Sequence, residues 1–131
     1  MTKDITEMQN PVSCFRTLCG FERVDDTLQI VLNESHMNGG GIMHGGLTAT
    51  LLDHVSSLPI TLKKGQLMAT IDLNVQYLSL GRIGQKLTAT ANLKKQGRDI
   101  AFIDACVKNE NGVIIATSSA IYKIFTLNKK K

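Results

Sequence analysis

The residues that could carry out chemistry in this 131-residue chain lie in one short stretch and at one acidic residue after it. Residues 38–47 read Asn-Gly-Gly-Gly-Ile-Met-His-Gly-Gly-Leu, and Asp53 follows six residues later. The glycines lead into a helix predicted from Leu47 to about Leu62, whose first N–H groups are unpaired and carry a partial positive charge. Because glycine lets an incoming oxygen approach these groups closely, the pattern suits a phosphate or a developing oxyanion.

Other chemistries fit the sequence less well. No Gly-Lys-Ser/Thr follows the glycines, and no strand–GxGxxG–helix unit is present, so the phosphate-loop patterns do not apply. A Ser–His–Asp triad lacks its G-x-S-x-G element. The histidines lack the spacing of metal ligands, so we expect no metal at His36, His44 and His54. The cysteines are odd in number and surrounded by apolar residues, which predicts inert core thiols at Cys14, Cys19 and Cys106.

Asp53 has an unusual position on the predicted helix. The apolar stripe consists of Leu47, Leu51, Val55 and Leu58, and Asp53 lies about 155° from its centre on a helical wheel. The residues three and four positions away are all small: Ala49, Thr50, Ser56 and Ser57. A solvated helical aspartate is one interpretation. A carboxylate that a ligand or a second helix can approach closely is the other.

The elements that must position these residues follow from periodicity. Asn10-Pro11 is typical of a helix start and predicts a short helix from about Pro11 to Cys19. A strand is expected at Thr27–Asn33, a loop at 34–46, and then the long helix, which Pro59 must kink or end early. Lys63-Lys64-Gly65 is expected to close that helix. Four alternating strands follow, at 69–78, 86–94, 99–107 and 113–125.

This order predicts an α+β fold in which a curved antiparallel sheet wraps around one long central helix. A single helix is wider than two strands, so the sheet must curl to be covered by it. Curling leaves open sheet edges, which a dimer that continues the sheet would cover. In the strand at 69–78, the alternation places Thr70 with Asp72 and Asn74, opposite Ile71 and Leu73, although Thr70 starts the strand and could border a cleft.

Composition and charge narrow the function classes. The chain is 43% hydrophobic and 20% charged, as in a soluble globular protein, and no apolar run could span a membrane. Three of the positive charges behind the net +4 are the last three residues, so the rest of the chain is nearly balanced and does not suggest nucleic-acid binding. We expect one domain over 1–131, with an N-terminal segment at 1–20 and a basic tail at 127–131. No targeting signal is readable, so a cytoplasmic location is expected, with a mitochondrial one left open.

Positive side chains are predicted to gather around one hairpin, and they are Lys86, Lys94, Lys95 and Arg98. A solvated rim is one interpretation of this group. A rim that binds the phosphates of a nucleotide-like ligand is the other.

At His44-Gly45-Gly46-Leu47 with Asp53, the chain resembles the hot-dog-fold acyl-CoA thioesterases of the PaaI-like group, in particular the thioesterase superfamily member 2 (acyl-coenzyme A thioesterase 13) type. Phe21–Val24, Asp72–Asn74 with Tyr77, and Lys95–Gly97 also match, so the resemblance runs from about Phe21 to Ala116. It implies a hot-dog fold and a homodimer that assembles into a homotetramer. It also implies hydrolysis of medium- or long-chain fatty acyl-CoA without a cofactor, since coenzyme A is part of the substrate.

The resemblance also implies roles for particular residues. Asp53 would be general base or nucleophile, facing the partner subunit's Asn38–Gly45 loop. Gly45 would offer its N–H to the thioester carbonyl, Asn38 would hold that carbonyl or the water, and His44 would support the loop and the leaving thiol. Thr70 stands where close relatives carry Ser and would position water. The residues implied to contact coenzyme A are Tyr77, Lys95, Gly97 and Arg98. Pro59 and the ending Ile121-Tyr122-Lys123 depart from those relatives.

Two further function classes stay open on the sequence. One is a hot-dog dehydratase or hydratase, although such enzymes usually pair a catalytic His with a carboxylate at other spacings. The other is an acyl-CoA-binding protein that uses the same groove without catalysis. Retention of Asp53 favours hydrolysis over binding alone.

Overall fold

A computed structural model describes residues 14–127 of the protein, so the predicted helix start at Pro11 and the three terminal lysines lie outside the described residues. The elements are α1 (Cys14–Cys19), β1 (Glu22–Val24), β2 (Thr27–Val31), a 3-10 turn (Glu34–His36), α2 (Gly45–Ser57), β3 (Gln66–Tyr77), β4 (Lys86–Gln96), β5 (Ile100–Asn109) and β6 (Ile114–Thr126). This succession confirms the predicted α+β class. It adds the short strand β1 and the 3-10 turn, which the sequence reasoning missed.

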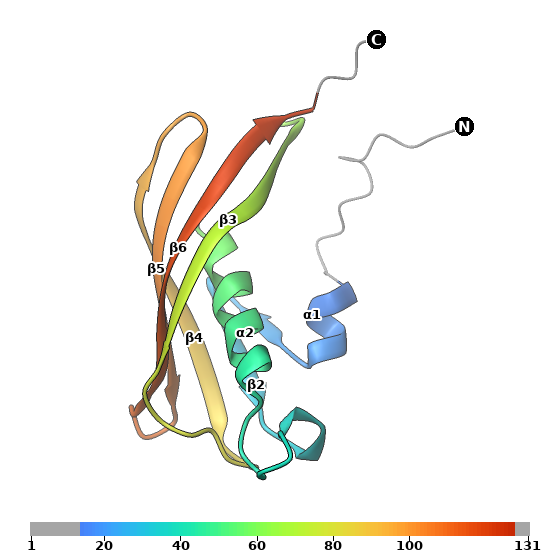
Figure 1. The fold of residues 1–131 in the computed structure, drawn as a ribbon. Coiled ribbons are helices and arrows are strands. Elements are labelled where there is room, and N and C mark those ends of the chain that lie inside the picture. Colours follow the sequence, from blue (N-terminus) through green and yellow to red (C-terminus); the bar gives the residue numbers. More distant parts are fainter. Residues whose placement is uncertain (1–13, 128–131) are drawn as a thin grey trace, which may run out of the picture.

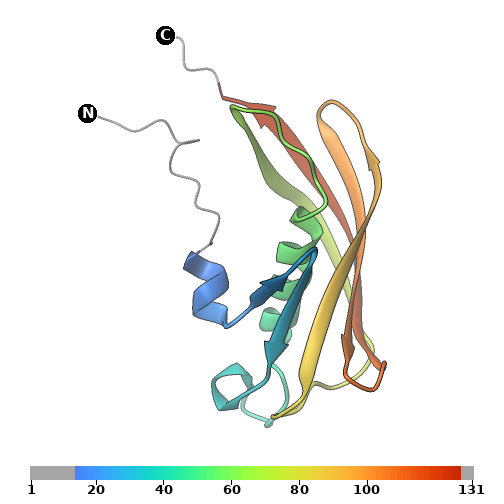
Figure 2. The same ribbon diagram turned by 180° about the vertical axis from the view of Figure 1, so that it is seen from behind.

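The strands form one antiparallel sheet in the order β1-β2-β4-β5-β6-β3. The sheet curves around α2, as predicted, and β3 lies at one edge (Figure 1). Seen from behind, β2 and the short α1 lie on the other flank of the central helix (Figure 2). The loop before α2 and the first turn of that helix therefore sit at one end of the sheet, and the β4–β5 hairpin sits at the opposite end (Figure 1).

The central helix is shorter than predicted and begins earlier. It starts at Gly45 and ends at Ser57, where Leu58 caps it with an N–H bond of 3.1 Å to the carbonyl of Val55. Pro59 has no N–H to continue the ladder, so the early end is confirmed and a kink is excluded. Lys63-Lys64-Gly65 is therefore not the helix stop, which corrects the prediction. No helix among residues 14–127 is long and apolar enough to cross a membrane.

The buried face of α2 differs from the predicted stripe. Its buried residues are Thr48, Leu51, Leu52, Val55 and Ser56, whereas Leu47 and Leu58 are only half-buried. The cause is the curvature of the sheet, because strands on several sides contact the helix and the buried arc is wider than one stripe. Asp53 consequently lies at the flank of this arc, where β3 and β6 run past, rather than on a solvent face.

A β-bulge in β3 changes which side chains face the helix. Thr70 and Asp72 pair with consecutive residues of β6, so Ile71 is the extra residue. The bulge reverses the alternation, and Thr70 therefore lies on the same inner face as Leu73 and Val75, which pack against the core. The predicted grouping of Thr70 with Asp72 is wrong, and Ile71 is 56% exposed.

Gly81 packs closely against the loop that precedes α2, so a side chain at this position should destabilise the fold. Its carbonyl accepts the Met43 N–H at 2.8 Å, and a Cβ at this position would lie 2.9 Å from Met43 Cβ and 3.0 Å from Leu32 Cδ1. Gly81→Ala should therefore lower the free energy of unfolding by about 1–3 kcal/mol through overpacking. Urea denaturation measures this, with Gly39→Ala as the matched control because nothing lies within 4 Å of a Cβ there. Equal stability of the two variants would contradict the packing argument.

Candidate active site

The glycine-rich loop before α2 is an ordered turn built around Asn38. The Oδ1 atom of Asn38 accepts N–H bonds from Gly40 at 2.8 Å and from Ile42 at 3.3 Å. Its backbone N–H donates to the Ile42 carbonyl at 2.7 Å, and Gly41 adopts a φ of 79°, which favours glycine. With Oδ1 engaged, the Nδ2 group of Asn38 is the part of the side chain left to meet a ligand.

His44 caps the central helix. Its Nδ1 atom accepts the Gly46 N–H at 2.9 Å, and its carbonyl accepts the N–H groups of Leu47 and Thr48. Because Nδ1 is an acceptor, the proton of the neutral ring is assigned to Nε2, which becomes a donor directed away from the helix. Among the described residues, no group accepts the N–H of Gly45. The first turn therefore keeps one free donor at its positive end.

Tyr77 links the end of β3 to this helix start. Its hydroxyl donates to the Gly45 carbonyl at 2.8 Å, and its ring would lie 3.6 Å from a Cβ at that glycine. A pocket of about 280 Å³ opens beside them, and its lining includes Asn38, Gly45, Thr48 and Tyr77. The structure thus brings together four of the predicted site residues: Asn38, His44, Gly45 and Tyr77.

Asp53 forms a second group with residues from the two neighbouring strands. Its Oδ1 atom accepts a hydrogen bond of 2.7 Å from the Thr70 hydroxyl and one of 2.6 Å from the Tyr122 hydroxyl. Tyr122 also bonds to the backbone carbonyl of Asp53. No described residue donates to Oδ2. The carboxylate is therefore anchored through one oxygen and open at the other.

Tyr122 is the site residue that sequence reasoning missed. It alternates with Ala120 and Ile124, so its ring points into the core, and a buried tyrosine hydroxyl usually finds a hydrogen-bond partner. This rule could have predicted a polar partner for Tyr122 from the sequence, although not that the partner is Asp53. Burial, together with the hydrogen bond to Asp53, raises the pKa of Tyr122 well above its ordinary value, so the phenol stays protonated near neutral pH.

The two groups are not close to each other within one chain. Gly45 and Asp53 are eight residues apart on the same helix, which is about 12 Å along its axis. A single carbonyl carbon cannot touch both the Gly45 N–H and the Asp53 carboxylate across that distance. The predicted catalytic residues thus form two groups. The loop half consists of Asn38, His44 and Gly45, and the carboxylate half consists of Asp53 and Thr70.

The predicted coenzyme A residues Lys95, Gly97 and Arg98 lie at the tip of the β4–β5 hairpin and are exposed. Arg98 Nε is 3.6 Å from a carboxylate oxygen of Asp99, and the Gly97 N–H donates to the Ile100 carbonyl. Lys86 does not belong to this cluster, contrary to the prediction. It begins β4, about 30 Å from the hairpin at the ordinary rise per strand residue.

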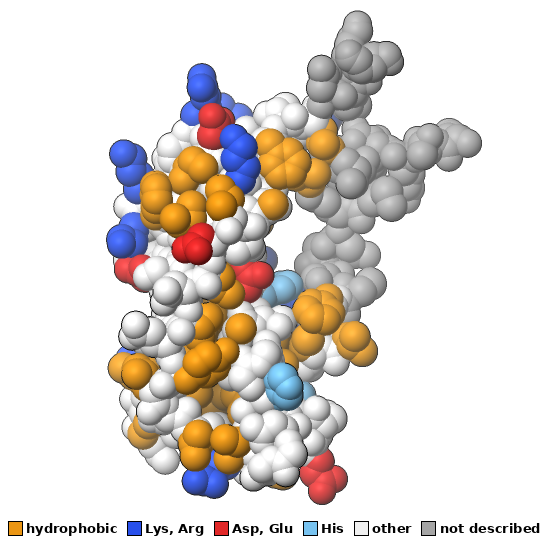
Figure 3. Space-filling view, in the orientation of Figure 1, with side chains coloured by type: hydrophobic (Ala, Val, Ile, Leu, Met, Phe, Trp, Pro, Cys, Tyr) orange, Lys and Arg blue, Asp and Glu red, His pale blue; other side chains and the backbone are white. Residues whose placement is uncertain are grey.

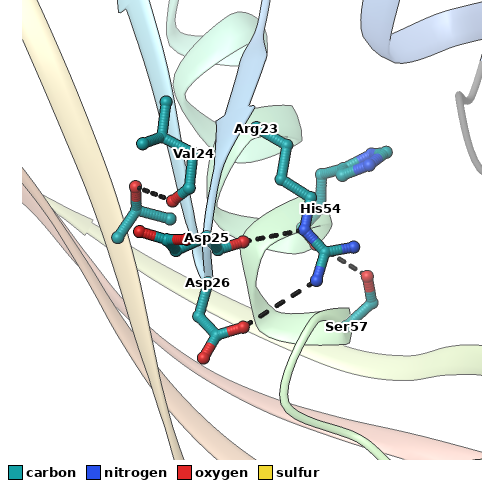
Figure 4. Close-up of polar contacts among 7 residues, drawn as sticks. Arg23, Val24, Asp25, Asp26, His54 and Ser57 are labelled. Carbon is teal, nitrogen blue, oxygen red and sulfur yellow. Dashed lines mark hydrogen bonds and ion pairs between the residues drawn. The ribbon is translucent and has the colours of Figure 1, made fainter.

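His54 follows Asp53 in sequence but faces the other flank of α2. Figure 4 shows it beside Arg23 of β1, and its ring meets Phe21 edge-on at 6.4 Å. Burial, with help from Arg16 and Arg23, lowers the pKa of His54 despite the opposing effect of Asp53. The ring is therefore neutral near neutral pH and packs as a core histidine. Within residues 14–127, no group of His, Cys, Asp or Glu side chains could hold a metal ion.

The cysteine prediction is partly corrected. Burial raises the pKa of the Cys19 thiol, which agrees with an inert role. Cys106, however, points to the outer face of the sheet, opposite Thr90, in a shallow pocket shared with Asn92 and Asp104. It is therefore not a core residue. The side chain of Cys14 lies outside the described residues.

The cap by His44 can be tested through stability. His44→Ala should lower the free energy of unfolding by about 0.5–2 kcal/mol, because it removes the acceptor for the Gly46 N–H. His44→Asn should lose much less, since asparagine is among the best residues for capping a helix start. Chemical denaturation of both variants gives the comparison. Identical losses in the two would mean that the Nδ1 bond contributes nothing.

Comparison with known proteins connects this arrangement to a family. The sequence model of the Thioesterase superfamily matches residues 40–116, which include His44, Gly45, Asp53 and Thr70 but begin two residues after Asn38. Acyl-coenzyme A thioesterase 13 of Mus musculus is 33% identical over 111 residues, covering 74% of this chain and 79% of the mouse protein. Medium/long-chain acyl-CoA thioesterase YigI of Salmonella typhimurium is 32% identical over 115 residues, covering 73% and 74%.

Solved structures agree with the sequence relatives. The BH2602 protein of Bacillus halodurans, whose crystal structure contains CoA, superimposes with a TM-score of 0.79 at 25% identity, over 87% of this chain and 77% of that one. Both the family match and the fold agree with the hot-dog architecture expected from the His44–Leu47 motif. The family match covers more than half of the chain, and the protein therefore belongs to the thioesterase superfamily.

Proposed function

We propose that this thioesterase hydrolyses medium- and long-chain fatty acyl-CoA to the free fatty acid and coenzyme A. The substrate class rests on the relatives, which are named acyl-CoA thioesterases, one of them for medium and long chains. The observation that carries the chemistry is the Asp53 carboxylate, which is held through Oδ1 and open at Oδ2. A binding protein without catalysis has no need for a carboxylate presented in this way.

Two routes are open in the proposed reaction. Asp53 Oδ2 either takes a proton from the water that attacks the thioester carbonyl carbon or attacks that carbon itself. The carbonyl oxygen becomes an oxyanion, which the free N–H of Gly45 and the Nδ2 group of Asn38 stabilise. The C–S bond then breaks, which gives the free acid when water has attacked; when Asp53 has attacked, it leaves a mixed anhydride on Asp53 that a water molecule hydrolyses to the free acid. The leaving thiolate is met by the Nε2–H of His44, because Nδ1 is already occupied by the helix cap.

Two subunits must supply one active site in this scheme, since Gly45 and Asp53 of one chain are about 12 Å apart. The edge strand β3 offers the contact, because within residues 14–127 it pairs with β6 alone and apolar side chains gather along it (Figure 3). On β3, Thr70 bonds to Asp53 and Tyr77 bonds to Gly45. Antiparallel pairing of two β3 strands, centred near Leu73 and Asn74, sets Thr70 beside the partner subunit's Tyr77. The carboxylate half of one chain thereby meets the loop half of the other.

The same pairing gives the hairpin of Lys95 and Arg98 a role. The hairpin and the start of α2 lie at opposite ends of one chain (Figure 1), so antiparallel pairing would bring the hairpin end of one chain towards the helix start of the other. Lys95 and Arg98 then lie where the phosphates of coenzyme A would emerge from a shared site, and Tyr77 contacts the ligand through its ring because its hydroxyl is occupied. Stacking of two such dimers into a tetramer completes the proposed assembly.

Replacing Asp53 by asparagine tests the proposed chemistry. Asparagine retains an Oδ1 that accepts from Thr70 and Tyr122 but removes the charge at Oδ2, so folding should be preserved. We expect kcat to fall by roughly 10²-fold or more, as for loss of a positioned base. The assay follows free thiol released from acyl-CoAs of several lengths, with the thermal midpoint as a folding check. Asp26→Asn, which neutralises an exposed carboxylate in the β1–β2 turn, serves as the matched control. A folded Asp53→Asn protein with wild-type kcat would contradict the proposed mechanism.

Mixing two inactive variants tests the shared site. Asp53→Ala inactivates the carboxylate half and Asn38→Ala impairs the loop half. After subunit exchange at equal amounts, half of the dimers are mixed and each mixed dimer has one of its two sites intact, so about a quarter of wild-type activity should return. Activity that stays at the mean of the two parents would show that each chain builds its own site.

A further inference from the structure

Tyr122 reaches Asp53 from the buried inner face of the sheet. It lies on the inner face of β6, directly opposite Thr70 of β3, and only 3% of its surface is exposed. Its ring packs in a cluster with Ile60, Ala101, Ile103, Ala120 and Ile124. The apolar packing fixes the ring, so the hydroxyl is the one polar part and its position is set by the core.

The polar neighbours of the Tyr122 hydroxyl are Asp53 and the Thr70 hydroxyl. It bonds to Asp53 Oδ1 at 2.6 Å and to the backbone carbonyl of the same residue. A distance of 2.6 Å is typical of a hydroxyl that donates to an ionised carboxylate, and such bonds are about twice as strong as neutral ones. With Thr70 also donating to Oδ1, two neighbouring strands hold the same oxygen.

Tyr122 is the donor in these hydrogen bonds because its phenol is protonated. Burial and the nearby Asp53 raise the pKa of Tyr122, so the phenol remains a donor near neutral pH. The other titratable group close to Asp53 is His54, which lies on the far flank of α2 against Phe21. The phenol therefore acts on the carboxylate by holding it, and it is not itself a proton acceptor.

From this geometry we infer that Tyr122 is a positioning residue, which together with Thr70 locks Asp53 Oδ1 and so presents Oδ2 alone to the substrate. The inference rests on the proposed function and deepens it. A carboxylate free to rotate about its last bond would exchange its two oxygens and spend part of its time misaligned. Displacement of a reacting group by about 1 Å can lower a rate as much as 10²-fold.

Tyr122→Phe is the direct test, because it removes only the hydroxyl. The expected result is a fall in kcat of about 10-fold or more with KM nearly unchanged, since the substrate does not touch Tyr122. Ser118→Ala is the matched control. Ser118 lies on the same inner face of β6, is buried, and its hydroxyl has no hydrogen-bond partner among the described residues. This control should keep wild-type kcat.

A second comparison separates positioning from a general structural role. In protein that already carries Asp53→Asn, adding Tyr122→Phe should leave the residual rate unchanged, because the carboxylate on which Tyr122 acts is gone. A merely structural role would lower the residual rate again. Wild-type kcat in Tyr122→Phe, with Asp53→Asn inactive, would overturn the inference while the proposed function stands. Wild-type kcat in Asp53→Asn would overturn both.

If Tyr122→Phe does not fold, a spectroscopic titration tests whether the Tyr122 hydroxyl interacts with the Asp53 carboxylate. Tyrosinate absorbance is followed with rising pH in wild type and in Asp53→Asn. The buried phenol should ionise at lower pH in Asp53→Asn, because the negative charge that opposes its ionisation is removed. Tyr77 is 56% exposed and serves as the internal reference. Superimposable curves for the two proteins would show that Tyr122 does not sense the Asp53 charge and would overturn the inference.

Discussion

The distance between Gly45 and Asp53 along α2 limits what one chain of this protein can bring to a single substrate. Both residues belong to one helix, and eight helical residues place them about 12 Å apart along its axis. No movement of a loop can bring them to one carbonyl group. The proposed chemistry therefore requires association of two chains, and in that proposal the edge strand β3 belongs to the active site as well as to the fold.

The β3 strand carries this link through its bulge. Without the extra residue Ile71, the alternation that buries Leu73 would turn Thr70 to the outer face, away from Asp53. With it, one strand uses its first half to hold the carboxylate and its last residue, Tyr77, to hold the carbonyl of Gly45. The free edge, the carboxylate and the helix start are thus fixed by the same twelve-residue element.

The two halves of the site are stabilised by different physics. The loop half consists mainly of backbone N–H and carbonyl groups closed by Asn38 and His44, and glycine permits close approach to it. The carboxylate half is a charged group at the border of an apolar core, with two hydroxyl donors at one oxygen. Donors at Oδ1 offset the cost of bringing the charge near the core, and Oδ2, which no described residue contacts through a hydrogen bond, is the oxygen that the proposed reaction uses.

Sequence alone predicted the α+β class and the four long strands, limited α2 to a kink or an early end at Pro59, and pointed to residues 38–47 and Asp53 as candidates for the chemistry. These features are local, since periodicity, proline chemistry and glycine spacing act within a few residues. The family resemblance extended that prediction to Thr70 and Gly45, whose roles stay predictions; the structure places Thr70 against Asp53.

Tertiary structure alone decided the rest. The inward position of Thr70 depends on a bulge, which is a property of the pairing between β3 and β6 and has no single-residue signature. Tyr122 meets Asp53 across 69 positions of sequence. Periodicity assigns a residue to a face, but which residue stands opposite depends on register, and register is set by the packing of the whole sheet around its helix.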